Sequence, residues 1–85
     1  MSKDNANYDL DARNLRCPLP LLKTKMMLSS MKDREILKVV ATDSGSYRDI
    51  PAFIKSSVHN LISVIFHEDT HEYEFLIEKK DIDNS

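Results

Sequence analysis

The stretch "NLRCPLPLLK", residues 14–23, decides how this chain folds. It contains the only cysteine of the sequence, Cys17, with Pro18 directly after it and Pro20 two residues further on. Proline at the first helical position costs nothing, because the N–H that it lacks has no intrahelical partner there. The other donors of a first turn are also unpaired, so Pro20 is tolerated as well. We therefore expect the prolines to begin a helix that runs to about residue 30, with Cys17 at its N-cap or first position.

Strand-like segments flank this helix on both sides. Residues 8–12, "YDLDA", alternate Tyr, Leu and Ala with acidic side chains, which is the period of a strand. Residues 35–42, "EILKVVAT", form a nearly continuous apolar run, which is typical of an interior strand. Between the first strand and the helix, Asn14 tolerates a positive φ, so we expect a left-handed turn position there.

The second half of the chain predicts a helix followed by a β-hairpin. Apolar side chains recur at helical spacing from Ile50 onward. A helix start near Tyr47 places Pro51 in the first turn, where proline is tolerated. Two strand-like segments then follow with a tight turn between them, "LISVIFHE" and "HEYEFLIEK".

The predicted order is strand, helix, strand, helix, strand, strand. Right-handed crossovers put both helices on one face of the sheet. The fold class is therefore α/β in the broad sense, an α+β two-layer sandwich of order βαβαββ with a four-stranded mixed sheet. We expect a single domain over residues 8–79, a flexible lead-in over residues 1–7 and a flexible tail over residues 80–85.

Size, charge and hydropathy narrow the functional classes. A chain of 85 residues is one domain, near the lower end of sizes that fold on a single core. A net charge of -2 offers phosphate no attraction, so we expect no direct nucleic-acid binding. The apolar runs are far shorter than the ~20 residues that cross a bilayer, so we expect no membrane insertion. The polar amino-terminal stretch "MSKDNANYD" is unlike a signal peptide, and we expect a cytoplasmic protein.

A single cysteine cannot form an intramolecular disulfide or a multi-thiolate metal site. Any exchange chemistry of Cys17 must therefore involve a partner. Of the histidines, His67 and His71 flank the hairpin turn, and His59 is expected to end the second helix, where a cation is favoured. No further ligand is spaced to complete a metal site around them. We expect no metal, no cofactor and a monomer.

The position of Cys17 bears on its reactivity. A thiolate at a helix N-terminus is stabilised by the helix dipole, and about 1 kcal/mol lowers the pKa of a thiol by about one unit. Arg13 and Arg16 could add to this effect. Pro18 and Pro20 remove two N–H donors, so we expect an exposed and moderately activated thiol. The alternative is a buried structural cysteine, because free Cys is among the most buried residue types.

The longer stretch "LDARNLRCPLPLLKTKMML" resembles the signature of the TusA/SirA-like family of small sulfur-carrier proteins, which share a Cys-Pro-x-Pro motif. A second block, "VVATDSGSYRDIPAFIKSSVHNL", resembles the family's strand ending in Asp, its small-residue turn and its Asp-Ile-Pro. The resemblance spans residues 8–79 and implies a βαβαββ sandwich. The chain departs from the family pattern at Asn14, where Gly is usual, and at Ser44, where Pro is common.

The resemblance implies that Cys17 carries sulfur as a persulfide. A cysteine desulfurase or a rhodanese-type donor would load it, and an acceptor protein would take the sulfur onward in a relay, for example for tRNA thiolation. The exchange resembles thiol–disulfide exchange and needs no cofactor; whether such a sulfurtransferase-like carrier is an enzyme stays open. Other branches of the family suggest thiosulfate use or selenium handling. The alternative is a regulatory or interaction module in which Cys17 is redox-sensitive or caps the helix.

Two acidic residues are candidates for a supporting role. Asp43 and Asp49 should lie at the same edge of the sheet as Cys17. Each also has an ordinary role: Asp43 in the turn and as a cap, and Asp49 as an acid in a first helical turn.

The remaining candidates surround the motif. Pro18 and Pro20 are expected to shape the site. Arg16, Lys25 and Arg48 could attract an acidic partner or polarise a sulfur group, or they are solvated surface charges. We expect Leu19 to point off the first turn and contact a partner, the alternative being that it packs on the second helix.

Overall fold

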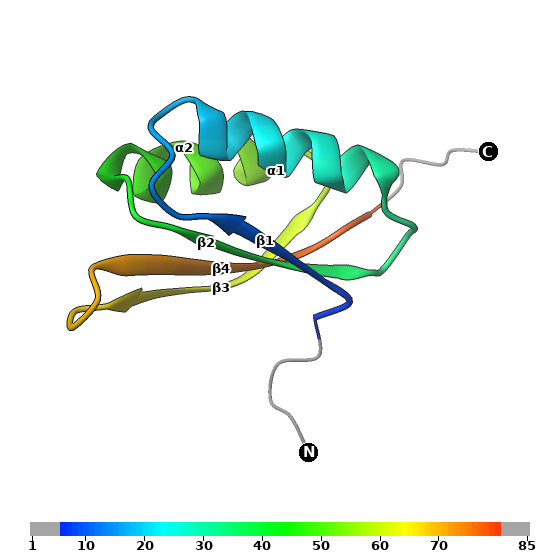
Figure 1. Ribbon diagram of the computed structural model, residues 1–85. Coiled ribbons are helices and arrows are strands. Elements are labelled where there is room, and N and C mark those ends of the chain that lie inside the picture. The colour runs from blue at the N-terminus through cyan, green and yellow to red at the C-terminus, as the bar shows by residue number, and fades with distance from the viewer. Residues whose placement is uncertain (1–5, 81–85) are drawn as a thin grey trace, which may run out of the picture.

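The computed structural model describes residues 6–80, which form a two-layer sandwich (Figure 1). Both helices lie side by side over the same face of a four-stranded sheet. This is the predicted βαβαββ fold. The elements in chain order are β1 (Tyr8–Ala12), α1 (Leu19–Ser30), β2 (Ile36–Ala41), α2 (Ser44–Lys55), β3 (Asn60–His67) and β4 (Glu72–Glu78).

The sheet has the strand order β1-β2-β4-β3. β1 pairs with β2 in parallel, with Leu10 opposite Val39, and β4 pairs antiparallel to β2, with Phe75 opposite Val39. β3 is antiparallel to β4 and therefore runs in the same direction as β2. The carboxyl ends of β1 and β2 and the start of α2 consequently meet at one end of the sheet (Figure 1).

The core lies between the sheet and the two helices. Strand alternation points one set of side chains toward the helices, and α1 and α2 each contribute side chains from above. Burying an aliphatic or aromatic side chain of this size contributes about 1.5–3 kcal/mol. The fully buried hydrophobic residues include Leu28, Leu37, Val39, Ile50, Ile54, Phe75 and Ile77.

The start of α1 differs from the prediction. Pro18 is the N-cap and Leu19 the first helical residue, so Cys17 lies outside the helix, before its cap. The first helical hydrogen bond runs from the N–H of Leu22 to the carbonyl of Pro18, at 3.0 Å. Pro20 is the second helical residue and is buried. Cys17 therefore makes no capping contact with α1, and the helix-capping alternative is wrong.

The bounds of α2 also differ from the prediction. The helix begins at Ser44, because the carboxylate of Asp43 accepts a hydrogen bond from the N–H of Gly45 at 3.0 Å and caps the chain there. Pro51 consequently lies inside the helix, and not in its first turn. The helix ends at Lys55, so His59 does not lie at its end; the ring Nδ1 of His59 instead accepts from the N–H of Lys80 at 3.1 Å.

The expected lead-in and tail fall largely outside the described residues. Within them, Asn7 is tied to the sheet by two hydrogen bonds with Ile36. Its N–H donates to the carbonyl of Ile36 at 2.8 Å, and its side-chain oxygen accepts from the N–H of Ile36 at 2.8 Å. Sheet pairing thus begins one residue before β1. None of the helices between residues 6 and 80 has the length and apolar character needed to cross a membrane.

Candidate functional site

Cys17 lies in the turn between β1 and α1, with its thiol exposed. The interpretation of a buried structural cysteine is therefore wrong. The turn is anchored at Asn14, whose φ of 66° is the predicted left-handed conformation and whose N–H donates to Thr42 Oγ1 at 2.9 Å. The N–H of Leu19 closes the turn onto the carbonyl of Arg16 at 2.8 Å. The peptide bond between Cys17 and Pro18 is cis.

The thiol has a hydrogen-bond partner in the second helix. Cys17 Sγ donates to Asp49 Oδ2 at 2.9 Å. Asp49 lies in the second turn of α2, and its side chain is 26% exposed. Its other carboxylate oxygen, Oδ1, lies 3.5 Å from Nε of Arg48, whose side chain is 81% exposed. The structure thus brings together three of the predicted residues in the order arginine, carboxylate, thiol.

Gly45 allows the first turn of α2 to approach this thiol. A Cβ at Gly45 would lie 3.3 Å from Cys17 Cβ, 3.6 Å from Cys17 Sγ and 2.8 Å from Asp43 Oδ2. The last distance is shorter than van der Waals contact permits, so a side chain here would displace the Asp43 carboxylate. Gly45 was not predicted as a site residue. The available signal was that it is the only glycine of the chain and follows the strand that ends beside the thiol.

The electrostatics of the site oppose a thiolate. The hydrogen bond to Asp49 raises the pKa of Cys17, and partial desolvation and the negative charges of Asp49 and Asp43 raise it further, whereas Arg48 acts in the opposite direction. The same hydrogen bond lowers the pKa of Asp49, with a contribution from Arg48. The predicted lowering of the thiol pKa is therefore wrong. Cys17 lies before the N-cap of α1, and two carboxylates act on its thiol.

Lys25 contacts the second helix. Its Nζ is 5.0 Å from the centroid of the Phe53 ring, a cation–π contact that joins α1 to α2. Phe53 follows Asp49, the hydrogen-bond partner of Cys17, by four residues, which is about one helical turn. The contact that the structure shows for Lys25 is with the Phe53 ring and not with Cys17.

An exposed apolar stripe begins beside the site. Leu19 is 43% exposed, as predicted for a residue that points off the first turn. Leu22 and Met26 continue along the same helix and are 49% and 63% exposed. Their spacing of three and seven residues from Leu19 puts all three on one side of α1. The buried positions of α1 are Pro20, Thr24 and Leu28.

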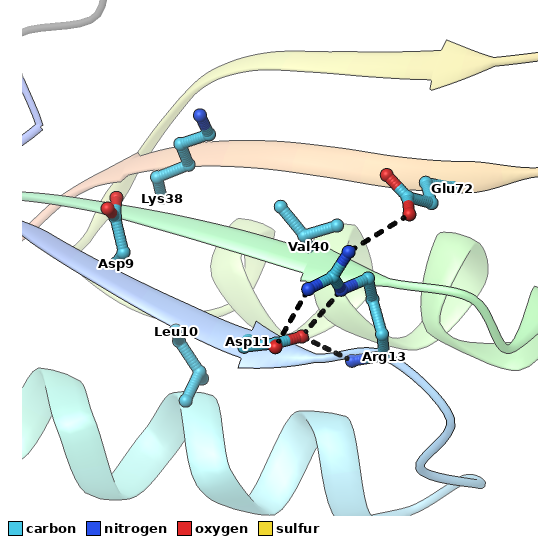
Figure 2. A pocket seen from close by; sticks show the side chains of 7 residues that line it. All are labelled: Asp9, Leu10, Asp11, Arg13, Lys38, Val40 and Glu72. Atoms are coloured by element: carbon cyan, nitrogen blue, oxygen red, sulfur yellow. Dashed lines mark hydrogen bonds and ion pairs between the residues drawn. The ribbon is translucent and has the colours of Figure 1, made fainter. Parts of the chain in front are cut away.

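Arg13 is held away from the thiol, on the sheet face opposite the helices (Figure 2). Its guanidinium binds Asp11, with Nε 2.8 Å from Oδ1, and reaches Glu72 Oε2 at 3.5 Å. The hydrogen bonds from Arg13 lower the pKa of Asp11 to about 2. Figure 2 shows these side chains in a hollow over Val40, between β1 and β4. Arg13 therefore connects β1 with β4 and does not act on Cys17.

The histidines make ordinary contacts. Nε2 of His67 lies 3.0 Å from Oε1 of Glu74 on the neighbouring strand. His71 adopts a φ of 58° in the hairpin turn, with its ring against Phe66. Within residues 6–80, no three His, Cys, Asp or Glu side chains gather as a metal site requires.

Fold and site together define a class: a small two-layer α/β domain that displays one exposed thiol beside a Cys-Pro-Leu-Pro helix start. The comparisons with known proteins identify this class. A family model described as "Sulfurtransferase TusA" matches residues 8–79. The "Sulfur carrier protein TusA" of Allochromatium vinosum is 41% identical over 73 residues, which cover 86% of this chain and 93% of that protein. The chain belongs to the TusA family.

Two further relatives extend the comparison. The "Putative sulfur carrier protein YrkI" of Bacillus subtilis is 42% identical over 53 residues, covering 62% of this chain and 71% of that protein. The crystal structure of a SirA-like protein from Desulfitobacterium hafniense matches with a TM-score of 0.76 and covers 87% of this chain and 99% of that one. At 16% identity, this last likeness concerns the fold alone.

Proposed function

We propose that this protein is a sulfur carrier that accepts sulfur as a persulfide on Cys17 and passes it to an acceptor protein. The observation that carries the proposal is the exposure of the only thiol of the chain, at the family motif. An exposed thiol in a turn can be reached by a second protein, whereas a buried one cannot.

The transfer is a sulfur exchange in which atoms and electrons balance. Cys17 Sγ attacks the terminal sulfur of a persulfide on the donor, a new S–S bond forms on Cys17, and the S–S bond of the donor breaks. The proton of the Cys17 thiol leaves with the donor's departing sulfur, which becomes a thiol. Discharge repeats the same exchange toward a thiol of the acceptor. The sulfur keeps its oxidation state throughout, so the chemistry requires no cofactor or metal.

The partners are a donor of the cysteine desulfurase or rhodanese type and an acceptor protein, for example one that leads to tRNA thiolation. Both must cover the surface around Cys17 for sulfur to change hands. The exposed stripe of Leu19, Leu22 and Met26 offers apolar contact area, and the exposed Arg16 and Arg48 offer charge. Pro18 and Pro20 fix the backbone on which the thiol is presented. We place this relay in the cytoplasm and expect the carrier to act as a monomer.

Intact-protein mass spectrometry tests the proposal. The protein and its Cys17→Ser variant are incubated with a cysteine desulfurase and cysteine, and separately with a rhodanese and thiosulfate. We expect the unmodified protein to gain one sulfur atom and the variant, still folded by circular dichroism, to gain none. Failure of both donors to load the unmodified protein contradicts the proposal.

A further inference from the structure

The charged groups that act on the Cys17 thiol lie on one side of it, toward α2. Cys17 Sγ meets Asp49 Oδ2 at 2.9 Å, and the groups that face it from α2 and its cap are Asp49, Asp43 and Arg48. Only one of these three is cationic, and its side chain extends into solvent. The thiol therefore faces net negative charge on the α2 side, while its other side is open.

The hydrogen bond also sets the direction of the sulfur. When the S–H of Cys17 points at Asp49 Oδ2, the lone pairs of the sulfur point away from α2. Gly45 contributes to this arrangement, because any side chain there would push against Cys17 Cβ and the Asp43 carboxylate. The nucleophilic side of the sulfur thus faces the open surface from which a partner approaches.

We propose that Asp49 is the positioning residue of Cys17: it holds the unloaded sulfur as an oriented, neutral thiol, and its charge turns the terminal sulfur of the loaded form toward solvent. The first part concerns the thiol alone, and the second rests on the proposed sulfur-carrier function. In the loaded form a persulfide anion meets the same two carboxylates, and repulsion between like charges disfavours any position beside them. Asp49 thereby keeps the free thiol protonated and less reactive, and it leaves the terminal sulfur of the persulfide accessible to an acceptor.

The test is the pH dependence of Cys17 alkylation by iodoacetamide, followed by intact mass. In Asp49→Asn the charge is removed with little change in shape. We expect the midpoint of the profile to fall and the alkylation rate at pH 7 to rise severalfold, because a lower thiol pKa increases the thiolate fraction. Asp69→Asn, in the hairpin turn, is the matched control and should keep the profile of the unmodified protein.

A second variant, Arg48→Gln, should shift the midpoint of alkylation in the opposite direction. Arg48→Gln removes the one cation of the cluster from an exposed position, so the fold should tolerate it. We expect its alkylation midpoint to rise and its rate at pH 7 to fall. The rise in Arg48→Gln checks that the assay responds to charge at the thiol, and the fall in Asp49→Asn is the shift that a merely structural role of Asp49 does not predict.

The alkylation profiles decide whether Asp49 positions the thiol. An Asp49→Asn profile that coincides with that of the unmodified protein overturns the inference. If Asp49→Asn does not fold, Asp49→Ser, which is neutral and smaller, is measured in its place: a lowered midpoint supports the inference and an unchanged midpoint overturns it. The alkylation assay contains no sulfur donor, so its result is independent of the loading experiment. A protein that fails to load but shows both shifts contradicts the carrier function and leaves the positioning role of Asp49 toward the thiol in place.

Discussion

Cys17 owes its chemical state to a residue 32 positions away in the sequence. Its immediate neighbours, two prolines and an arginine, suggest an activated thiol at a helix end. The folded chain instead sets Asp49 against the sulfur and brings Asp43 near it, and the pKa of Cys17 rises. A reactive group in a small domain is thus governed by whichever charges the topology brings beside it. For Cys17, these charges come from α2 and its N-cap, Asp43.

The raised pKa of Cys17 makes the stability of the fold fall with increasing pH in the alkaline range. The folded state binds the thiol proton more tightly than the unfolded state, so this contribution is present below the unfolded-state pKa and is lost as the pH rises through the folded-state pKa. Between about pH 8 and pH 10, the unmodified protein should therefore lose more stability than Cys17→Ser, which has no thiol to ionise. Urea unfolding of both proteins across this range measures the difference. If the free energies of unfolding of the two proteins fell equally with pH, the pKa of Cys17 would not differ between the folded and unfolded states.

At the scale of single elements, existence and order of the helices and strands were predictable, and the helix starts were not. Alternation in β1 and β4 and helical spacing in α2 are properties of the local sequence. The start of α2 was expected near Tyr47, because the helical spacing of apolar side chains begins at Ile50. Asp43 was expected in the turn and as a cap, and its carboxylate begins the helix three residues earlier. Where a cap starts a helix depends on side-chain geometry that residue spacing does not specify.

This cap gives a prediction for α2. Asp43→Ala removes the acceptor for the N–H of Gly45, and we expect the free energy of unfolding to fall by about 1 kcal/mol, within the ~0.5–2 kcal/mol known for N-caps. Asp43→Asn keeps a side-chain acceptor and should retain most of the stability. Thermal or urea unfolding of the two variants provides the comparison, and equal stability of both would contradict the assigned cap.

At the scale of the whole molecule, the order of elements and the handedness of crossovers were sufficient to predict the two-layer sandwich. The site was only partly predictable. Its place at one end of the sheet follows from topology, and so does the proximity of Asp43 and Asp49 to Cys17. The roles of Gly45, Arg13 and Lys25 did not follow, because they depend on close approach and on side-chain direction across elements.

The division of α1 into a buried and an exposed face gives a matched pair of variants. Leu28 is 1% exposed in the core between the layers, whereas Leu22 is on the open side of the same helix. Leu28→Ala should lower the free energy of unfolding by about 2–5 kcal/mol, because it leaves a cavity. Leu22→Ala should stay within about 0.5 kcal/mol of the unmodified protein. Urea unfolding of both variants tests this, and a large loss in Leu22→Ala would contradict the exposed stripe.

A sulfur carrier must both take up sulfur on Cys17 and give it away. To measure both steps, the protein is loaded with a cysteine desulfurase and cysteine and separated from the donor, and reduced glutathione is added as a model acceptor thiol while intact mass is followed. We expect one sulfur atom to appear on the unmodified protein only, and glutathione to remove it as glutathione persulfide and restore the Cys17 thiol. Sulfur that stays on the protein, or that binds equally to Cys17→Ser, would contradict the carrier function of Cys17.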